Sequence, residues 1–172
     1  MRSKSIWNLL IVGFFPFMLI SCTVSYKFNR ASIDYNVVKT ITIESFTNRA
    51  SYQWGPMASI FSNALSDIYV RQTKLKQVKT NGNLHLSGEI TSYDQTNKSI
   101  SSDGYSSMVQ LKMSVRVVFV NNTNHSEDFE RTFSATREYE SSQQFSVVQE
   151  ELVTQMTNEI VDQIFNATVA NW

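Results

Sequence analysis

The side chains that most often carry out chemistry are few in this chain. Of its 172 residues, two are histidines and one is a cysteine. His85 and His125 fit no metal-ligand spacing such as H-x-x-x-H. The sequence also contains no G-x-S-x-G elbow, no glycine-rich phosphate loop and no Cys/His nucleophile pair. It therefore predicts neither an enzyme nor a metal centre, and it calls for no cofactor.

The cysteine, Cys22, follows a segment with the features of a secretory signal. Arg2 and Lys4 give a positively charged start, Leu9–Ile20 is apolar, and Ser21 is a small residue just before the cysteine. This order of regions is that of a signal peptide. The apolar stretch is shorter than the about 20 residues that a membrane-spanning helix needs. We expect residues 1–21 to be cleaved off.

The sequence Leu19-Ile20-Ser21-Cys22 resembles a bacterial lipobox at every position. The resemblance implies a thioether-linked diacylglycerol on Cys22, and acylation of its new amino group with a fatty acid such as palmitate. One acyl chain holds a protein on a membrane only marginally, whereas two or more hold it stably. A single cysteine cannot form an internal disulfide, and lipidation accounts for it. Cys22 is therefore the predicted lipid-attachment residue.

Cations carry the other chemical signal in the sequence. Four come close together just after the first predicted helix, namely Arg71, Lys74, Lys76 and Lys79. Two more lie on the polar side of a predicted strand, Lys112 and Arg116. Basic residues at a helix C-terminus interact favourably with the helix dipole, and this is the simpler interpretation. The alternative is a cationic patch for a phosphorylated lipid.

Length and charge indicate one ordinary domain. Removal of residues 1–21 leaves 151 of the 172 residues. A chain of this length can bury roughly 70% of its unfolded surface without a metal or disulfide. The remaining part has 13 basic and 15 acidic residues, a net charge of −2, which argues against a nucleic-acid binder. We expect a lipidated tether over 22–36 and a single domain over 37–172.

The elements that position these residues follow from hydrophobic periodicity. Strands are expected at 37–46, 75–78, 83–93, 108–120 and 129–139, and helices at 51–74 and 146–171. The clearest strand is 108–120, where apolar side chains from Val109 to Phe119 alternate with polar ones. Residues 94–107 are polar and are interpreted as a loop. Ser146 and Gln149 have the spacing of a capping box.

These elements predict an α+β fold. A sheet with one apolar face must cover that face, and two amphipathic helices can do so. We expect a two-layer sandwich, in which both helices pack on one face of a mixed, mostly antiparallel sheet of about four strands. Gly88, inside a predicted strand, indicates a bulge or the close approach of another group.

Four segments form an ordered set along the mature chain. They are Ile43–Ala50, Leu65–Asp67, Leu84–Ile90 and Ala167–Trp172. Together with Cys22, this set resembles the LptE family of lipopolysaccharide-assembly lipoproteins, in the form found in the Bacteroidetes group. The resemblance covers nearly the whole mature chain and includes no catalytic motif. It implies the same fold of a sheet with two helices.

The resemblance also implies a function and partners. Such a protein is anchored in the outer membrane and faces the periplasm and the lumen of the large β-barrel LptD. It plugs that barrel and assists the placing of lipopolysaccharide in the outer leaflet. The six cations then become lipopolysaccharide-binding candidates, although none of them is carried over from the family.

Two other classes of function remain open. A free carrier of lipid would have a closed apolar cavity between the sheet and the helices. An anchored enzyme would have a cleft with convergent titratable groups. Both predicted helix faces are used for packing, which disfavours the carrier. The sequence offers too few candidate groups for the enzyme, so the assembly partner is the favoured interpretation.

Overall fold

A six-stranded sheet and two long helices form the part of the chain that the structure describes. The structure is a computed structural model, and it describes residues 33–100 and 106–169. The predicted α+β class is confirmed, with more strands than the roughly four expected from the layer argument. The expected signal peptide and Cys22 lie outside the described residues.

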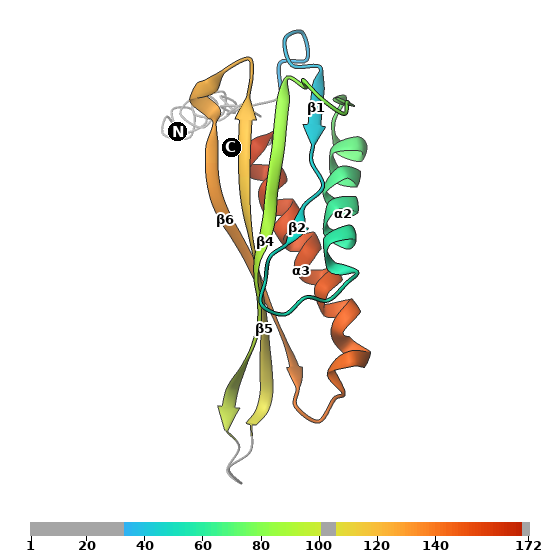
Figure 1. Ribbon diagram of the computed structural model, residues 1–172, viewed down its shortest axis with the longest axis vertical. Coiled ribbons are helices and arrows are strands. Elements are labelled where there is room, and N and C mark those ends of the chain that lie inside the picture. Colours follow the sequence, from blue (N-terminus) through green and yellow to red (C-terminus); the bar gives the residue numbers. More distant parts are fainter. Residues whose placement is uncertain (1–32, 101–105, 170–172) are drawn as a thin grey trace, which may run out of the picture.

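The sheet combines a short parallel edge with three long antiparallel strands (Figure 1). The strands are β1 (Thr40–Ile43), β2 (Thr47–Asn48), β3 (Lys76–Gln77), β4 (Leu84–Ile100), β5 (Ser106–Asn121) and β6 (Phe129–Glu140). Their order is β3-β1-β4-β5-β6, and β2 pairs with β4. β1 pairs in parallel with β3 and β4, and β2 also pairs in parallel with β4. β5 pairs antiparallel with both β4 and β6, in line with the mostly antiparallel sheet expected from the sequence.

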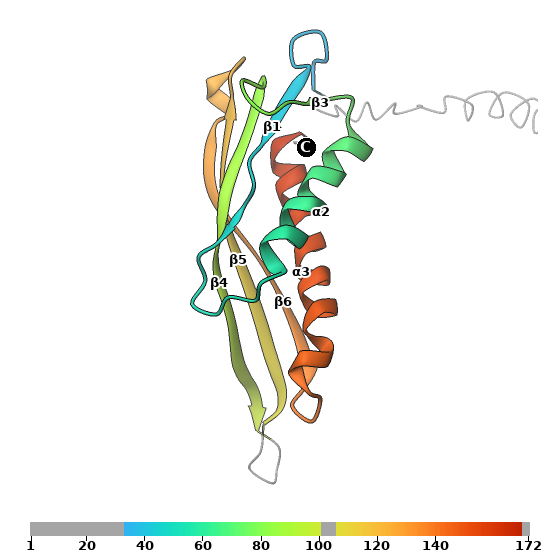
Figure 2. The ribbon, with the colours of Figure 1, turned by 45° about the vertical axis from the view of Figure 1, so that its right-hand side comes forward.

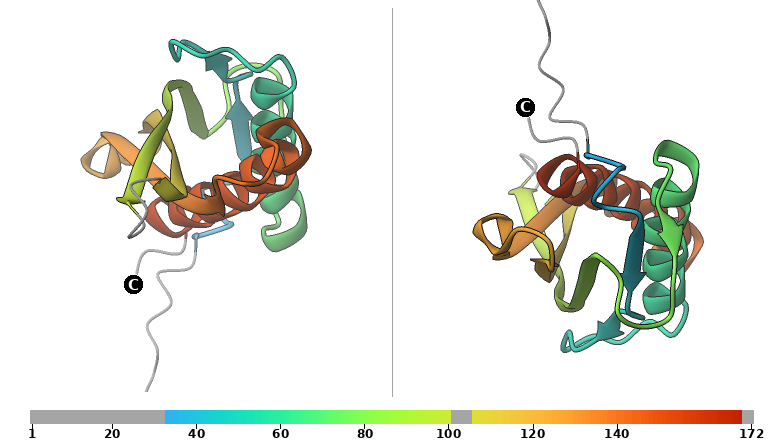
Figure 3. Two further views of the ribbon diagram at one scale, coloured as in Figure 1. Left: turned by 90° about the horizontal axis from the view of Figure 1, so that it is seen from below. Right: turned by 90° about the horizontal axis from the view of Figure 1, so that it is seen from above.

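Both helices lie on the same face of the sheet (Figure 2). They are α2 (Met57–Gln72) and α3 (Phe145–Thr168), and a short 3-10 helix, η2 (His125–Glu127), connects β5 to β6. The views along the long axis show the opposite face of the sheet uncovered by any described helix (Figure 3). The predicted two-layer arrangement is therefore confirmed.

One apolar layer fills the space between the sheet and the helices. β5 supplies six side chains at alternate positions, each at most 9% exposed: Val109, Leu111, Met113, Val115, Val117 and Phe119. The buried stripe of α2 consists of Met57, Phe61, Leu65, Ile68 and Tyr69. The main buried positions of α3 are Leu152, Met156, Ile160 and Ile164. Each element thus presents apolar side chains at its own period, as the sequence predicted.

The expected loop over residues 94–107 is wrong for 94–100 and 106–107, and residues 101–105 lie outside the described part of the chain. β4 continues to Ile100 and β5 begins at Ser106, with Asp94 opposite Lys112 and Thr96 opposite Gln110. Hairpin strands pair through their backbones, and this pairing needs no apolar side chain. Sequence periodicity reports only side chains, so a strand that is polar on both faces has no signal in it.

The expected helix boundaries and capping box also need correction. α2 begins at Met57 rather than at 51, because Pro56 occupies its N-cap position. The N-cap of α3 is Gln144, whose side chain makes no capping hydrogen bond. Gln149 is instead buried, and its amide donates to the Tyr93 hydroxyl over 3.2 Å. Packing of this side chain in the core has overridden the local capping pattern.

Gly88 lies where the chain comes too close to its neighbours for a side chain. A Cβ atom at this position would be 2.2 Å from the carbonyl oxygen of Arg116 and 2.5 Å from Cε1 of Phe46. The predicted close approach is confirmed. The register of β4 against β5 shifts only further along the strand, first between Ile90 and Ser92 and again between Asn97 and Ile100.

Replacing Gly88 with alanine should lower the free energy of unfolding by about 1–3 kcal/mol, because one of the crowding groups is backbone and cannot rotate away. Urea denaturation followed by circular dichroism measures this change. Gly55→Ala is the matched control, since no atom lies within 4 Å of its Cβ position. Equal denaturation midpoints for Gly88→Ala and the unchanged chain would contradict the close approach.

Candidate functional site

Each histidine pairs with one carboxylate at the protein surface. In β4, His85 Nε2 is 3.0 Å from Glu44 Oε1. In η2, His125 Nδ1 is 2.9 Å from Asp128 Oδ2. Within residues 33–100 and 106–169, no three His, Cys, Asp or Glu side chains gather as a metal site requires. The two histidines therefore act as surface pairing groups in the described fold.

The uncovered face of the sheet is mostly polar, with Val118 and Val120 as apolar side chains at one end of β5. Ser92, Ser114 and Ser134 lie opposite one another across β4, β5 and β6. Further along the same strands, Lys98 pairs with Glu138. We call this surface, formed by the outward side chains of β4, β5 and β6, the open face. Its neutral hydroxyls and paired charges can form hydrogen bonds with another polar surface at little electrostatic cost.

Arg116 is the centre of a charge cluster on the open face. Its Nη1 atom is 3.0 Å from Glu130 Oε1, and its Nη2 atom is 2.9 Å from Glu89 Oε1. Hydrogen bonds to Glu130 and then to Glu89 hold the pKa of Arg116 above its ordinary value. Because two carboxylates compensate this guanidinium, it has less charge to offer to a phosphate than Lys112, which has no ion-pair partner among the described residues.

The structure separates the six predicted cations into two groups. Arg71 lies in the last turn of α2, and Lys74, Lys76 and Lys79 lie in or beside β3. These elements are at the end of the molecule where the described chain starts (Figures 1 and 2). Lys112 and Arg116 lie on the open face. The segment of β4 from Leu84, beside β1, to Asp94, opposite Lys112, spans roughly 30 Å. Lys112 therefore does not extend the first group into one patch.

Two buried tyrosines connect α3 to the rest of the core. The Tyr69 hydroxyl of α2 is 2.5 Å from Thr168 Oγ1, and the Tyr93 hydroxyl of β4 accepts the Gln149 hydrogen bond. Burial raises the pKa of Tyr93 to about 12 and also raises the pKa of Tyr69. Both hydroxyls therefore stay protonated and hold the two ends of α3 against α2 and the sheet.

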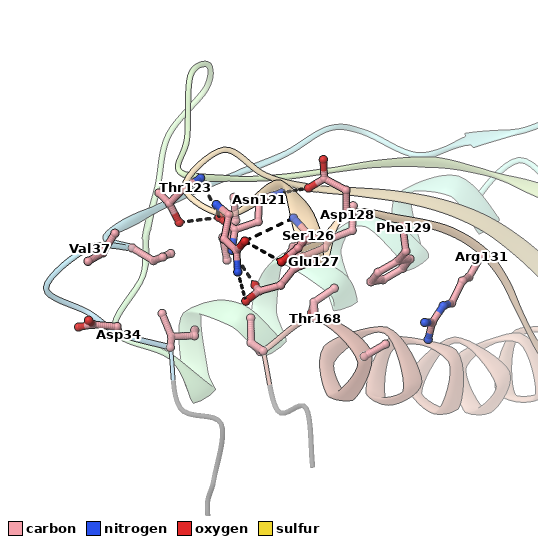
Figure 4. Close-up of a pocket in the computed structure, with 17 residues that line it drawn as sticks. Asp34, Val37, Asn121, Thr123, Ser126, Glu127, Asp128, Phe129, Arg131 and Thr168 are labelled. Carbon is pink, nitrogen blue, oxygen red and sulfur yellow. Dashed lines mark hydrogen bonds between the residues drawn. The ribbon is translucent and has the colours of Figure 1, made fainter.

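A cavity of about 580 Å³ opens at the end of the core where residues 33 and 169 lie (Figure 4). Its apolar wall consists of Ile33, Val37, Val38, Leu84, Phe119, Phe129, Ala167 and Val169. Its polar wall is the β5–β6 connection, where Asn121 Nδ2 donates to Glu127 over 2.7 Å. The backbone N–H of Asn121 donates to Asp128, and this bond holds the pKa of Asp128 below its ordinary value.

The sequence does not single out this polar wall, since residues 121–128 have only the composition of a turn between two strands. The available signal was the density of Asn, Ser and Asp, whose side chains bind nearby backbone groups in turns. Asn124 shows the pattern, since its side chain accepts from Ser126 Oγ over 2.7 Å and donates to Glu127 over 2.9 Å. These local bonds engage Glu127 and Asp128, whereas Arg131, which also lines the cavity, has no ion-pair partner among the described residues and packs over the Phe129 ring.

Residues 38–168 match the protein family described as LptE: Lipopolysaccharide-assembly. The chain belongs to the LptE family. The resemblance to this family is thereby confirmed, and membership places the chain among lipoproteins of lipopolysaccharide assembly. A comparison with curated proteins found no match. No helix among the described residues is both long and apolar enough to cross a bilayer.

Two solved structures share the fold of this LptE-family chain. Rare lipoprotein B from Shewanella oneidensis is 13% identical with a TM-score of 0.53, over 74% of this chain and 92% of that chain. A hypothetical protein from Chlamydia trachomatis is 11% identical with a TM-score of 0.51, over 78% of this chain and 99% of that chain. The likeness supports the arrangement of two helices on a mixed sheet.

The buried tyrosines predict that stability falls in alkali. An exposed tyrosine in the unfolded chain loses its proton near the ordinary pKa of 10.0, whereas folded Tyr93 keeps it to about 12. Between these values the unfolded state binds fewer protons, so the free energy of unfolding decreases as pH rises. Below the ordinary pKa of 10.0, both states keep the proton, so the stabilising contribution of the buried hydroxyl is fully present.

Urea denaturation at a series of pH values above neutrality measures this decline. Tyr93→Phe should flatten it, because the titrating hydroxyl is gone, and Tyr69→Phe should do the same. Tyr52→Phe serves as the control, since this ring is half-exposed and stacks on Tyr93 without the buried hydroxyl. If the free energy of unfolding falls with pH equally steeply in Tyr93→Phe, Tyr69→Phe and the unchanged chain, the buried hydroxyls are not the cause of the decline.

Proposed function

We propose that this protein is the lipoprotein partner of a large LptD-like outer-membrane β-barrel. It sits in the barrel lumen as a plug and assists the placing of lipopolysaccharide in the outer leaflet. The family match over residues 38–168 carries the proposal, because it spans almost the whole described domain. In this role the protein binds and positions its partners and carries out no reaction.

The open face supports the proposal as the surface that meets the barrel wall. A water-lined lumen presents polar groups, and a matching surface needs many hydrogen-bonding groups and few uncompensated charges. Ser92 and Ser134 provide hydrogen-bonding groups on either side of the buried Ser114, and the Glu89–Arg116–Glu130 cluster provides charges that are already paired. Charges that are already paired avoid the penalty of burying an isolated ion at an interface.

In this proposal the chain is held at the outer membrane through Cys22. Residues 1–21 are removed, residues 22–36 form the tether, and residues 37–172 form the domain. From Cys22 to Ile33 an extended chain spans at most roughly 40 Å, which is long enough to let the domain reach a neighbouring barrel. Two or more acyl chains on Cys22 keep the anchoring stable.

The six cations are proposed contacts for the phosphates of lipopolysaccharide, as two separate surfaces. Lys112 is the stronger candidate for a phosphate contact on the open face. Arg116, further along the same strand, is already compensated by Glu89 and Glu130. Lysine binds phosphate as a point charge, so an exposed ammonium group suits this contact. Arg71 is the weakest member of the other surface, since its Nη1 atom is 4.0 Å from Asp67 Oδ2.

A free lipid carrier fits the geometry less well. Such a protein needs an apolar cavity between its layers, and that space holds side chains such as Leu65, Met113 and Met156, which are 0% exposed. The cavity of about 580 Å³ lies at the end of the core and has a polar wall. The described part of the chain thus favours the assembly partner over the carrier.

Purification from native membranes tests this function. The chain would carry a C-terminal tag, the membranes would be solubilised gently, and co-purifying proteins would be identified by mass spectrometry. We expect a large β-barrel in stoichiometric amount that survives washing. The mass of the N-terminal peptide should show a lipidated Cys22 in the same sample.

The control is an unrelated tagged lipoprotein from the same membranes, which should bring down no barrel. Recovery of a lipidated but solitary monomer would overturn the proposed partnership. The carrier function would then lead, and lipid bound to the purified protein would be the next observation to seek.

A further inference from the structure

Four lysines gather at one corner of the molecule. Lys39 precedes β1, Lys74 follows α2, Lys76 is in β3, and Lys79 comes shortly after it. The backbone N–H of Lys76 donates to the Lys39 carbonyl oxygen over 2.9 Å, so the two lie on adjacent strands. All four side chains are exposed. We call these four residues the lysine corner.

The lysine corner has no carboxylate partner in the described chain, whereas most other cations do. Lys98 pairs with Glu138, Arg116 with Glu89 and Glu130, and Arg137 with Glu159. The closest aromatic contact in the corner is that of Lys74 Nζ, 5.9 Å from the ring centroid of Tyr35. The corner therefore presents uncompensated positive charge to its surroundings.

The lysine corner adjoins the segment that leads back to Cys22. The backbone N–H of Lys74 donates to the Tyr35 hydroxyl over 3.4 Å, and Tyr35 is close to the first described residue, Ile33. β3, the start of β1 and the C-terminal end of α2 all lie at this end of the molecule, and the β4–β5 hairpin extends to the opposite end (Figures 1 and 2).

Carboxylates near this end are separate from the corner or already engaged. Asp67 faces Arg71 at 4.0 Å, and Asp34 accepts from the backbone N–H of Asn36 over 2.9 Å. Glu127 and Asp128 belong to the β5–β6 connection, which lies across the end from β3 and α2 when the molecule is seen from above (Figure 3). Glu127 and Asp128 thus lie away from the lysine corner, whereas Asp34, next to Tyr35 in the chain, leaves one carboxylate near its four lysines, so the corner keeps a net positive charge.

We propose that the lysine corner rests on the anionic phospholipid headgroups of the leaflet that holds the lipid anchor. This inference rests on the proposed function, because it takes Cys22 as the anchor, and it concerns the protein before it joins a barrel. The acyl chains fix one point of the chain, and the corner supplies a second, reversible contact. Two contacts orient the domain on the membrane, whereas a tether alone leaves it free to rotate.

Electrostatic theory gives the size of the effect. A lysine close to an anionic membrane surface strengthens binding by a factor of about five, and the contribution falls off within a Debye length. Removal of three lysines should therefore weaken binding on the order of a hundredfold. Salt should weaken it as well, because the Debye length falls from about 10 Å at 0.1 M to about 3 Å at 1 M.

Vesicle co-sedimentation of an unlipidated chain tests the inference. The chain would lack residues 1–21 and carry Cys22→Ser, which removes the acyl chains but none of the described core, since that core lies within 38–169. The vesicles would contain equal parts of phosphatidylglycerol and phosphatidylethanolamine, and vesicles of phosphatidylcholine would provide the neutral surface. We expect salt-sensitive binding to the anionic vesicles only.

The decisive comparison is between two triple variants of equal charge. K74Q/K76Q/K79Q removes three charges from the corner, and R49Q/K98Q/R137Q removes three charges outside both proposed phosphate-binding surfaces. Circular dichroism would confirm that both are folded. The first variant should lose on the order of a hundredfold in its partition coefficient, and the second should lose far less. Equal losses would overturn the inference, because binding would then follow net charge alone.

Two further results would also overturn it. One is the absence of binding to anionic phospholipid. The other is binding that appears only when lipopolysaccharide is added to the vesicles, which would assign the corner to that lipid instead. The assay contains neither the anchor nor a barrel, so its failure is distinguishable from a failure of the partnership seen in membrane purification.

Discussion

One apolar layer between the sheet and the two helices holds the fold together, and the other features depend on it. β5 contributes the centre of this layer, from Val109 to Phe119, and α2 and α3 cover it. Because both helices lie on one face, the opposite face of the sheet has to meet water or a partner. Its outward side chains are mostly polar, with the Glu89–Arg116–Glu130 cluster, Lys112, which is unpaired among the described residues, and two valines at one end of β5, and this surface is the one left for a partner.

Polar groups inside the layer fix how α3 lies on it. The Tyr69–Thr168 and Tyr93–Gln149 contacts join α3 to α2 and β4 near its two ends. Apolar packing alone tolerates small shifts, whereas a buried hydroxyl left without its partner costs about 1–3 kcal/mol. Thr157 is the exception in the described chain, because its buried Oγ1 atom has no hydrogen-bond partner. The hydrogen-bonded ends thus set the position of the helix, and with it the shape of the open face.

Much of this architecture follows from periodicity, which predicts the face of β5 and the buried stripes of α2 and α3. Periodicity fails where side chains have no preferred face, as in the Asp94–Ile100 part of β4, and where a tertiary contact displaces a local one, as at Gln149. The separation of Lys112 from the cations around β3 could not be predicted either, because strand order and register decide it. The cavity wall at 121–128 depends likewise on hydrogen bonds that form only once the hairpin is paired.

In the proposed function, this LptE-family chain, with one covered and one open sheet face, meets a barrel through the open face. A photo-crosslinking amino acid at Thr132, which lies opposite Arg116 on β6, tests it in native membranes. The same probe at Asn158, exposed on α3, provides the comparison. If the open face meets the barrel, position 132 should crosslink to a large outer-membrane β-barrel more strongly than position 158 does. A barrel crosslink from position 158 with none from position 132 would contradict it.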